Sequence, residues 1–191
     1  GCSSLTSVTV EWEEPIAISN GCFSNAANAT LYVPMGTNYK YSAATGWKEF
    51  GQIVNWTKSS LFAEDVIVCR GGQLTLPVML TNDVDVRMLQ FELSLPDGVS
   101  VATDGMGNPL ATLTQRANAT HIITGSLLTN GNYQFQIMAK GISDDVFQGS
   151  EGRIATITLK VLRNVTPSDY DVRITDSELT IDGESMPLLL S

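Results

Sequence analysis

The segment Val86–Val101 constrains the fold more than any other part of this sequence, because its residues alternate strictly in character. Every second residue is apolar, namely Leu89, Phe91, Leu93 and Leu95. The residues between them are polar, and a period of two with one apolar face is typical of a half-buried β-strand. The turn sequence Pro96–Gly98 then ends this strand. We therefore expect the later two-thirds of the chain to be β-strands that pack around it.

Further segments of this region show the same chemistry. We expect strands at 65–70, 74–80, 110–116, 121–128, 133–140, 153–162, 170–175 and 178–182, the last ending at Asp182–Gly183. Pro77 faces the opposite side from the apolar residues of its segment, which favours an edge position. Asn130–Gly131 is a strong hairpin signal between two of the segments. Many short strands with frequent turns indicate an antiparallel β-sandwich.

The first third of the chain has a different period. Leu5, Val8 and Val10 have the spacing L-x-x-L-x-L of a leucine-rich-repeat strand, and Leu31 and Val33 repeat Val8 and Val10 at one constant offset. This offset, about 23 residues, lies in the range of roughly 20–29 residues that such repeats occupy. Two strands at this offset stack in parallel, one per coil, with Asn20–Gly21 as a turn and Phe23 beneath the coil.

These residues also carry a resemblance. The segments CSSLTSVTV, Cys22–Phe23, TLYVPMGT, Tyr41, GWKEF and Ile53–Val54 resemble the last repeat and closing cap of BspA-like leucine-rich-repeat surface proteins of Bacteroidetes-type bacteria. The resemblance covers about 55 residues and implies a longer solenoid before them. A stack of only about two coils has an open end and needs its neighbour for stability.

One helix is expected, at Thr37–Thr45, with Thr37 as its cap and Gly46 at its end. The apolar residues that follow its pattern close the hydrophobic end of the repeats: Tyr41, Ala44, Trp47 and Phe50. Trp47 is therefore expected in the core, and ligand stacking is the alternative.

The segment Asn55–Leu61 is polar apart from Trp56 and is interpreted as a linker. The predicted organisation is a repeat cap at 1–55, a linker at 56–61 and a sandwich at 62–191. Because the linker is short, the two parts should touch. Trp56 is expected to wedge between them, with a binding platform as the alternative.

The second part carries its own resemblance. The segments MLQFELSLPDGVSV, QFQIMAKG and GRIATITLKV resemble a cohesin-like domain, a flattened β-sandwich of jelly-roll topology. Cohesins bind dockerins, but no dockerin and no calcium loop is present in this sequence. The predicted fold class is thus mainly β: a short leucine-rich-repeat cap with one helix, followed by an antiparallel cohesin-like jelly-roll β-sandwich.

The net charge of −9 argues against nucleic-acid and anionic membrane partners, which need basic patches. There is no apolar run of about 18 residues and no signal-peptide pattern. The chain opens on Gly1–Cys2 without Met, and we expect it to be a fragment of a longer protein.

The three cysteines, Cys2, Cys22 and Cys69, lack the spacing of a zinc site or a disulfide framework. Three small buried hydrophobic residues are the favoured interpretation. Cys2 as a lipid attachment site is the alternative, which the repeat resemblance makes less favourable.

No catalytic constellation is predicted. His121 is the sole histidine, without a nucleophile or ligand motif near it, and is expected on a strand surface. The acidic pairs Asp83/Asp85 and Asp144/Asp145 do not fit an EF-hand, and a weak calcium site is the alternative. Glu11, Glu13 and Glu14 are expected to be solvated rather than a glycosidase pair. The sequons at Asn28, Asn55, Asn118 and Asn164 are interpreted as chance.

The sequence thus favours a non-enzymatic, secreted or surface-exposed binding or adhesion protein with a host or microbial protein partner. It predicts no cofactor, no metal and no catalytic residue, and leaves the ligand-binding residues unknown. The alternatives are a carbohydrate-binding module or an accessory domain of a larger polysaccharide-processing protein. A glycan module would need exposed aromatics in a row, and Tyr133 and Phe135 lie on a side that looks like core.

Overall fold

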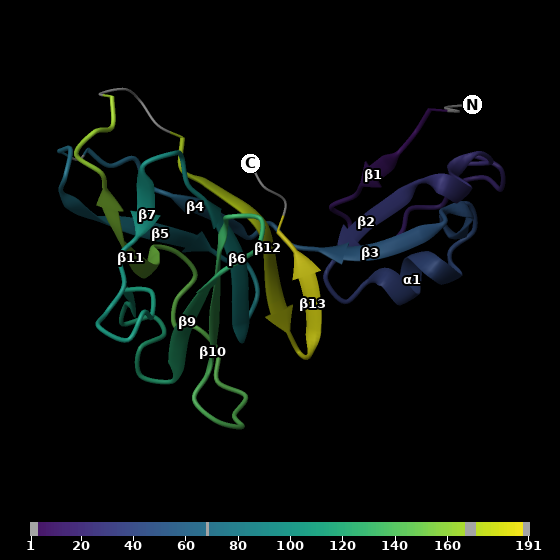
Figure 1. The fold of residues 1–191 in the computed structure, drawn as a ribbon. Coiled ribbons are helices and arrows are strands. Elements are labelled where there is room, and N and C mark those ends of the chain that lie inside the picture. The colour runs from purple at the N-terminus through teal and green to yellow at the C-terminus, as the bar shows by residue number, and fades with distance from the viewer. Residues whose placement is uncertain (1–3, 68, 167–170, 189–191) are drawn as a thin grey trace. The chain divides into compact units, whose positions relative to one another are not determined.

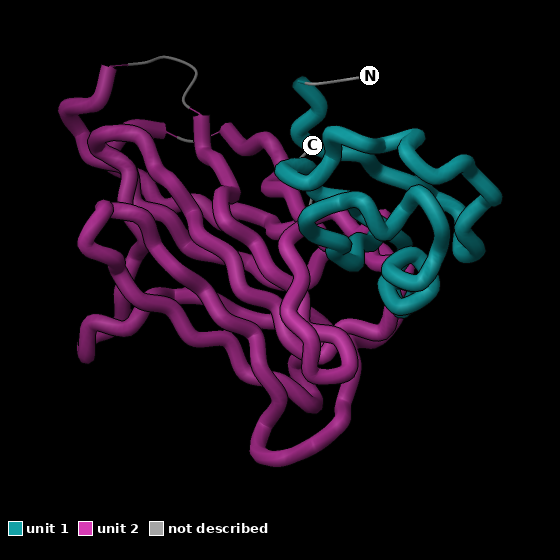
Figure 2. The backbone as a smooth tube through the Cα atoms, turned by 90° about the vertical axis from the view of Figure 1, so that its right-hand side faces the viewer, with its two compact units in different colours: residues 1–57 teal, residues 58–191 magenta. Residues whose placement is uncertain are grey.

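The computed structural model describes residues 4–67, 69–166 and 171–188. They divide into two compact units, unit 1 with residues 1–57 and unit 2 with residues 58–191 (Figure 2). The protein is mainly β with few helices, as the sequence predicted. Cys2 lies outside the described residues, so neither interpretation of it is tested.

Unit 1 contains a parallel sheet in the order β1-β2-β3 (Figure 1). Its strands are β1 (Ser7–Thr9), β2 (Thr30–Pro34) and β3 (Gln52–Trp56). Val8 lies opposite Leu31, and Leu31 lies opposite Ile53. The parallel stacking predicted from the constant offset is therefore confirmed, and β3 continues it as a further strand at nearly the same offset.

The helix α1 (Asn38–Ala43) is shorter than predicted, and 3-10 turns at Ala26–Asn28 and Trp47–Glu49 accompany it. Thr37 precedes the helix, but its hydroxyl donates to the Pro34 carbonyl at 2.7 Å and makes no cap bond. Ala44 is already extended, so the helix ends before Gly46.

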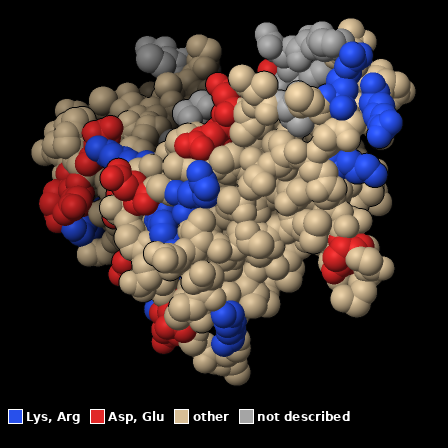
Figure 3. Space-filling model, turned by 90° about the vertical axis from the view of Figure 1, so that its left-hand side faces the viewer, with Lys and Arg blue, Asp and Glu red and all other residues tan. Residues whose placement is uncertain are grey.

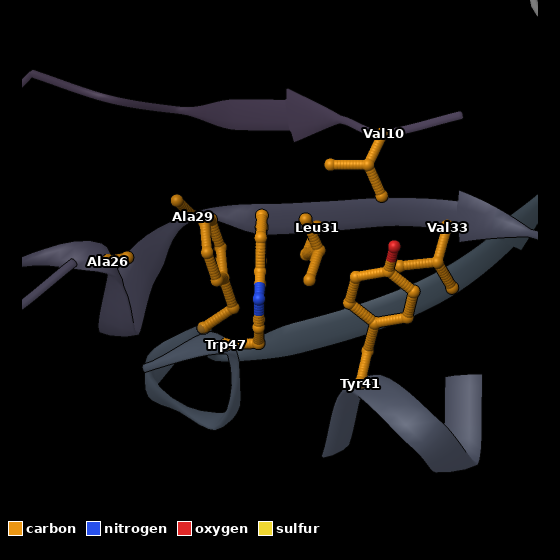
Figure 4. Close-up of a cluster of buried hydrophobic side chains, with 8 residues drawn as sticks. Val10, Ala26, Ala29, Leu31, Val33, Tyr41 and Trp47 are labelled. Carbon is orange, nitrogen blue, oxygen red and sulfur yellow. The ribbon is translucent and has the colours of Figure 1, made fainter. Parts of the chain in front are cut away.

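The core of unit 1 lies between the sheet and these turns (Figure 4). Its buried members are Val10, Ala26, Ala29, Leu31, Val33, Tyr41, Trp47 and Phe50. Trp47 is only 3% exposed and meets Tyr41 edge-on, with ring centroids 5.3 Å apart. Phe23 packs against the same cluster. The core position predicted for Trp47 is confirmed, and the alternative of ligand stacking is wrong because its ring faces are covered.

Unit 2 is a sandwich of two antiparallel sheets (Figure 1). The first sheet contains, in spatial order, β13 (Glu184–Pro187), β12 (Arg173–Ile181), β6 (Met88–Ser94), β10 (Tyr133–Ala139) and β9 (His121–Leu127). The second contains β4 (Ser60–Ala63), β5 (Gln73–Thr81), β11 (Arg153–Val161) and β7 (Val99–Val101), with β8 (Ala111–Leu113) also on β11.

The strand β6 is central to the first sheet, and its alternation is as the sequence predicted. Leu89, Phe91 and Leu93 are fully buried, while the residues between them are half-buried on the other face. Phe91 stacks on Phe135 of β10 at 5.5 Å. Leu95 lies beyond the strand, because the turn at Pro96–Gly98 begins there.

The strand predicted at 65–70 is wrong. β4 ends at Ala63, and the described residues that follow are exposed, Ile67 fully so. Glu64 N–H donates to the Pro77 carbonyl, and in an antiparallel ladder Pro77 would have to return a bond to Glu64. Proline has no N–H, so the ladder between β4 and β5 stops at this pair.

The edge position predicted for Pro77 is also wrong. β5 lies between β4 and β11, and Pro77 is opposite Thr156 of β11. Proline is tolerated on this inner strand because its missing donor faces the side on which β4 has just ended.

The later strands of unit 2 agree with the sequence prediction at one hairpin and differ from it near the C-terminus. The hairpin at Asn130–Gly131 is confirmed, since β9 and β10 pair across it. The segments predicted at 170–175 and 178–182 form one strand, β12, with a register shift between Thr175 and Glu178. Asp182–Gly183 does not end the set but turns into β13, which pairs with β12. Tyr170 lies outside the described residues.

Secondary structure also extends into the predicted linker. Trp56 ends β3 and Ser60 begins β4, so only 57–59 lie between the strands. The role of Trp56 as a wedge between the units stays a prediction.

Candidate binding surfaces

His121 is a buried polar group of unit 2 whose hydrogen bonds lie within the fold. His121 is 1% exposed, so the strand-surface position predicted for it is wrong. Its Nε2 lies 3.0 Å from the Arg87 carbonyl and its Nδ1 lies 2.7 Å from the Thr120 hydroxyl. Its ring also packs edge-on against Phe147. With both nitrogens bonded, burial of this side chain costs little.

Arg116 is a second structural group. Its guanidinium bonds no carboxylate but five oxygens of the surrounding loops: those of Leu80 at 2.7 Å, Gln148 at 2.8 Å, Gly152 at 3.0 Å, Gly149 at 3.1 Å, and the side-chain oxygen of Asn82. Burial lowers the pKa of Arg116 from its ordinary value, but guanidinium stays protonated in proteins. Arg116 thus pins the loop before β11 to the end of β5.

The acidic pairs do not form a metal centre in the described part of the chain, where no group of three or more His, Cys, Asp or Glu is placed to hold an ion. Asp83 accepts from the Lys58 amide and the Ser59 hydroxyl. Asp144 pairs with Arg87. Each of these two carboxylates therefore has a structural partner.

The remaining acidic residues and the cysteines lie at the surface. Glu14 pairs with Lys40, whose ammonium has a raised pKa because of that hydrogen bond. Glu11 and Glu13 are exposed, as expected for solvated groups. Cys22 and Cys69 are exposed free thiols, so the prediction that they are buried is wrong. Cys69 lies between β4 and β5, outside the strands of the sheet.

The outer face of the first sheet of unit 2 carries an apolar row. Met138 of β10 lies opposite Ile122 of β9. On its other side the last pair of the register is Ile137 with Leu89, so the next residue pair is Met138 with Met88. Ile122 is 42% exposed, and both methionines are half-buried. This Ile–Met–Met row crosses three neighbouring strands, β9, β10 and β6.

The rest of this face is polar, with charged residues at Glu92 of β6 and at Arg173 and Glu178 of β12. Gln136 donates to Gln90 at 2.6 Å, and Glu92 accepts from Asn132 at 2.9 Å. The amides thus form fixed cross-strand pairs, and the carboxylate of Glu92 is held. Such a surface offers flat apolar contact next to ordered polar groups.

The outer face of the second sheet is polar in a different way. Thr75 lies opposite Thr158, and the hydroxyls of Thr112 and Thr156 are 2.6 Å apart. Figure 3 shows a broad surface without charged side chains, with Lys, Arg, Asp and Glu in separate groups around it. Phe62 on β4 is its exposed aromatic residue.

Unit 1 presents the outer face of its parallel sheet. Tyr32 lies opposite Val54, and Pro34 lies opposite Trp56. All four are half-buried. The indole nitrogen of Trp56 donates to the Val10 carbonyl at 2.9 Å. The sequence leaves a binding platform at Trp56 open as the alternative to a wedge but predicts no second aromatic residue beside it, because the position of Tyr32 depends on the parallel register of β2 and β3.

Among the described residues, no helix is long and apolar enough to cross a membrane. No protein-family model and no curated protein matches the chain.

Several solved structures are similar to it. One is the type I cohesin–dockerin complex Coh-OlpA-Doc918 from Clostridium thermocellum, 11% identical over 69% of this chain and 92% of that chain, with a TM-score of 0.54. The Coh-OlpC-Doc435 complex from the same organism is 11% identical over 69% and 86%, with a TM-score of 0.52. A non-cellulosomal cohesin from Archaeoglobus fulgidus is 16% identical over 70% and 86%, with a TM-score of 0.52.

The matched share of the chain is about as large as unit 2. At these identities the similarity concerns the fold and not a shared ligand. The protein therefore contains a cohesin-like β-sandwich, as its sequence resemblance implied.

Proposed function

We propose that this chain is part of a non-enzymatic, secreted or cell-surface binding protein whose unit 2 binds another protein. The observation that carries the proposal is the row formed by the exposed Ile122 and the half-buried Met138 and Met88 on the first sheet. Two of the structures with a similar fold are complexes of a cohesin with a protein partner, its dockerin.

The physical character of the face supports this assignment. Protein interfaces are depleted of charge at their centre and enriched in methionine and aromatic residues. Methionine side chains adapt to different partners because they are unbranched and polarizable. An exposed isoleucine on a rigid strand, with two methionines beside it, can insert into a partner without reordering the backbone.

For unit 1 we propose the terminal coils and cap of a leucine-rich repeat. The support is the pair of parallel registers, Val8 opposite Leu31 and Leu31 opposite Ile53, whose sequence offsets both lie within the range of such repeats. The chain would then be the end of a longer solenoid, placed on the bacterial surface to adhere to host or microbial partners.

A glycan module in unit 2 has less support. Phe91, Phe135 and Phe147 are buried, and Tyr133 is half-buried. The described part of unit 2 therefore offers no aromatic row on either sheet. An accessory role beside a catalytic domain stays an alternative, which the sequence of the full gene would test.

The proposal is tested by surface plasmon resonance with the whole chain immobilised. The probes are the dockerins of the two similar complexes and the matrix proteins fibronectin and fibrinogen. We expect saturable binding of at least one probe, and Ile122→Lys should weaken it by about tenfold or more, since it places a charge in the apolar contact. The matched control is Thr75→Lys, which adds the same charge at an exposed position of the other sheet.

Equal weakening by both substitutions would mean that charge alone matters and that the Ile–Met–Met row is not the contact. Absence of binding to all four probes would remove the proposed classes of partner.

A further inference from the structure

The parallel sheet of unit 1 has a defect in its hydrogen bonding at Pro34. The Val10 amide donates to the Tyr32 carbonyl. In a parallel ladder, the carbonyl of the same residue then accepts from the residue two positions further on the partner strand. That residue is Pro34, which has no N–H. The Val10 carbonyl is thus deprived of its regular donor, although Val10 is only 5% exposed.

The side chain of Trp56 supplies the missing donor. Its indole N–H bonds the Val10 carbonyl at 2.9 Å. Trp56 is on β3 and Val10 follows β1, while β2 lies between those strands. The indole therefore reaches across β2 at the level of Pro34, its neighbour in the register. This bond fixes the ring in one orientation on the outer face of the sheet.

Two of the three outward rows of this sheet are uncharged, and in order across the strands they are Thr9–Tyr32–Val54 and Ser7–Thr30–Gln52. The third row contains Pro34 and Trp56, and the exposed Glu11, which follows Val10, is level with it by continuation of the register. Thr9, Ser7 and Gln52 are exposed, and Tyr32 and Thr30 are half-buried. Tyr32 and Trp56 therefore lie two residue positions apart along the strands, with hydroxyl and amide side chains beside them.

We propose that this face binds a neutral glycan, with pyranose rings packed against Trp56 and Tyr32. The indole N–H is already bonded within the protein, so the exposed part of Trp56 offers a ligand only its apolar surface. A pyranose fits such a surface, because its axial C–H groups form an apolar face while its hydroxyls point to the sides. Thr9, Thr30 and Gln52 are placed to exchange hydrogen bonds with those hydroxyls.

Charge decides between glycan classes. In a chain with a net charge of −9, an anionic polysaccharide would be repelled, and no Lys or Arg occupies the three outward rows to offset this. A neutral polymer, such as a glucan, xylan or mannan, meets no such penalty. Because the hydrogen bond to Val10 already fixes the indole of Trp56, this side chain loses little entropy when a ligand binds, which favours affinity.

The test is isothermal titration calorimetry of the whole chain with neutral hexasaccharides: cellohexaose, laminarihexaose, xylohexaose and mannohexaose. We expect saturable binding of at least one of them. Trp56→Ala and Tyr32→Ala should each weaken it by tenfold or more. Tyr32→Ala removes no hydrogen bond of the fold, so it keeps the test valid if Trp56→Ala disturbs the sheet. The control Trp12→Ala removes an indole that is 51% exposed outside these rows and should leave the affinity within twofold.

A decaproline peptide is titrated in parallel, because polyproline helices also pack on aromatic surfaces. Saturable binding of decaproline without binding of any hexasaccharide would overturn the glycan assignment. So would hexasaccharide binding that persists in both Trp56→Ala and Tyr32→Ala, or no binding of any hexasaccharide at all. None of these results bears on the Ile–Met–Met row of unit 2, so the two proposals can fail separately.

Discussion

We expect Pro34 and Trp56 to be energetically coupled, because the indole N–H of Trp56 takes the place of the backbone N–H that Pro34 lacks. In Trp56→Phe the Val10 carbonyl loses its donor, and an unsatisfied buried acceptor costs about 1–3 kcal/mol. In Pro34→Ala the residue at position 34 regains an N–H that the register aims at the same carbonyl. Trp56→Phe should then leave no orphan acceptor in the Pro34→Ala background.

The expected coupling energy is therefore about 1–2 kcal/mol. The smaller ring of phenylalanine lowers the packing area in both backgrounds, so that loss cancels in the double-mutant cycle. The measurement is hydrogen exchange of peptides from β2 and β3, which reports the opening free energy of unit 1 alone. Trp12→Phe is the matched control, because Trp12 is exposed and should show no coupling to Pro34.

A coupling energy below about 0.3 kcal/mol would refute this reasoning, because the free-energy changes of substitutions at independent sites add to within about that amount. It would mean that the Val10 carbonyl finds another partner when the indole is removed. Faster exchange in Pro34→Ala alone would show that contact between the indole and the proline ring outweighs the regained ladder bond.

Three further predictions concern unit 2. Phe91→Ala should cost about 3–5 kcal/mol in urea unfolding, as expected for a fully buried aromatic residue, while Ser94→Ala on the opposite face of β6 should stay within about 0.5 kcal/mol; equal losses would contradict the assigned faces. Arg116→Lys should cost about 1–3 kcal/mol in the same assay, because an ammonium group cannot reproduce the five bonds of the guanidinium; unchanged stability would show that water replaces them. The pKa of Asp104 lies below its usual value, chiefly because of the hydrogen bond from the Asn108 side chain, so its ordering of the loop is present above the ordinary carboxyl pKa and is lost as the pH falls through the lowered value. Asp104→Ala should therefore remove the acid-dependent part of amide exchange in this loop, and an unchanged pH profile would refute the role of the carboxylate.

Alternation in the sequence was sufficient to find the centre of the sandwich. The inward residues of β6 and β11 are apolar at every second position over most of each strand, so only one assignment of faces buries them. The same holds for the parallel strands of unit 1, where the repeat period sets the register directly. In these segments local pattern and tertiary packing require the same residues inside.

The burial of His121 could not be found in this way. Its strand begins with apolar residues on both faces, since Ile122 points outward and Ile123 lies on the side of His121. Burial of the imidazole depends on a carbonyl and a hydroxyl from Arg87 and Thr120. The carbonyl is supplied by a residue 34 positions away, and no local period reports it.

The candidate surfaces were missed for a related reason. The Ile–Met–Met row joins residues of three strands that are remote in the sequence, and only the pairing of β9, β10 and β6 makes them neighbours. Each of these residues alone looks like an ordinary exposed hydrophobic side chain, which is common on protein surfaces. A patch becomes visible only when the order of the strands is known.

Two prolines show why strand ends resist prediction from composition. Val66 and Ile67 are β-branched, and propensity alone favours a strand there. The strand fails because Pro77, further along the chain, cannot return a bond to Glu64. At Pro34 the same lack of a donor coincides with the end of β1, and the Trp56 indole of β3 donates to the Val10 carbonyl that is left unpaired. The ladder therefore ends at both prolines, since β1 stops at Thr9 and β4 stops at Ala63. The difference lies in the carbonyl that is left unpaired, because only at Pro34 does a side chain of another strand reach it. Such a partner depends on strand order, which no local pattern of the sequence reports.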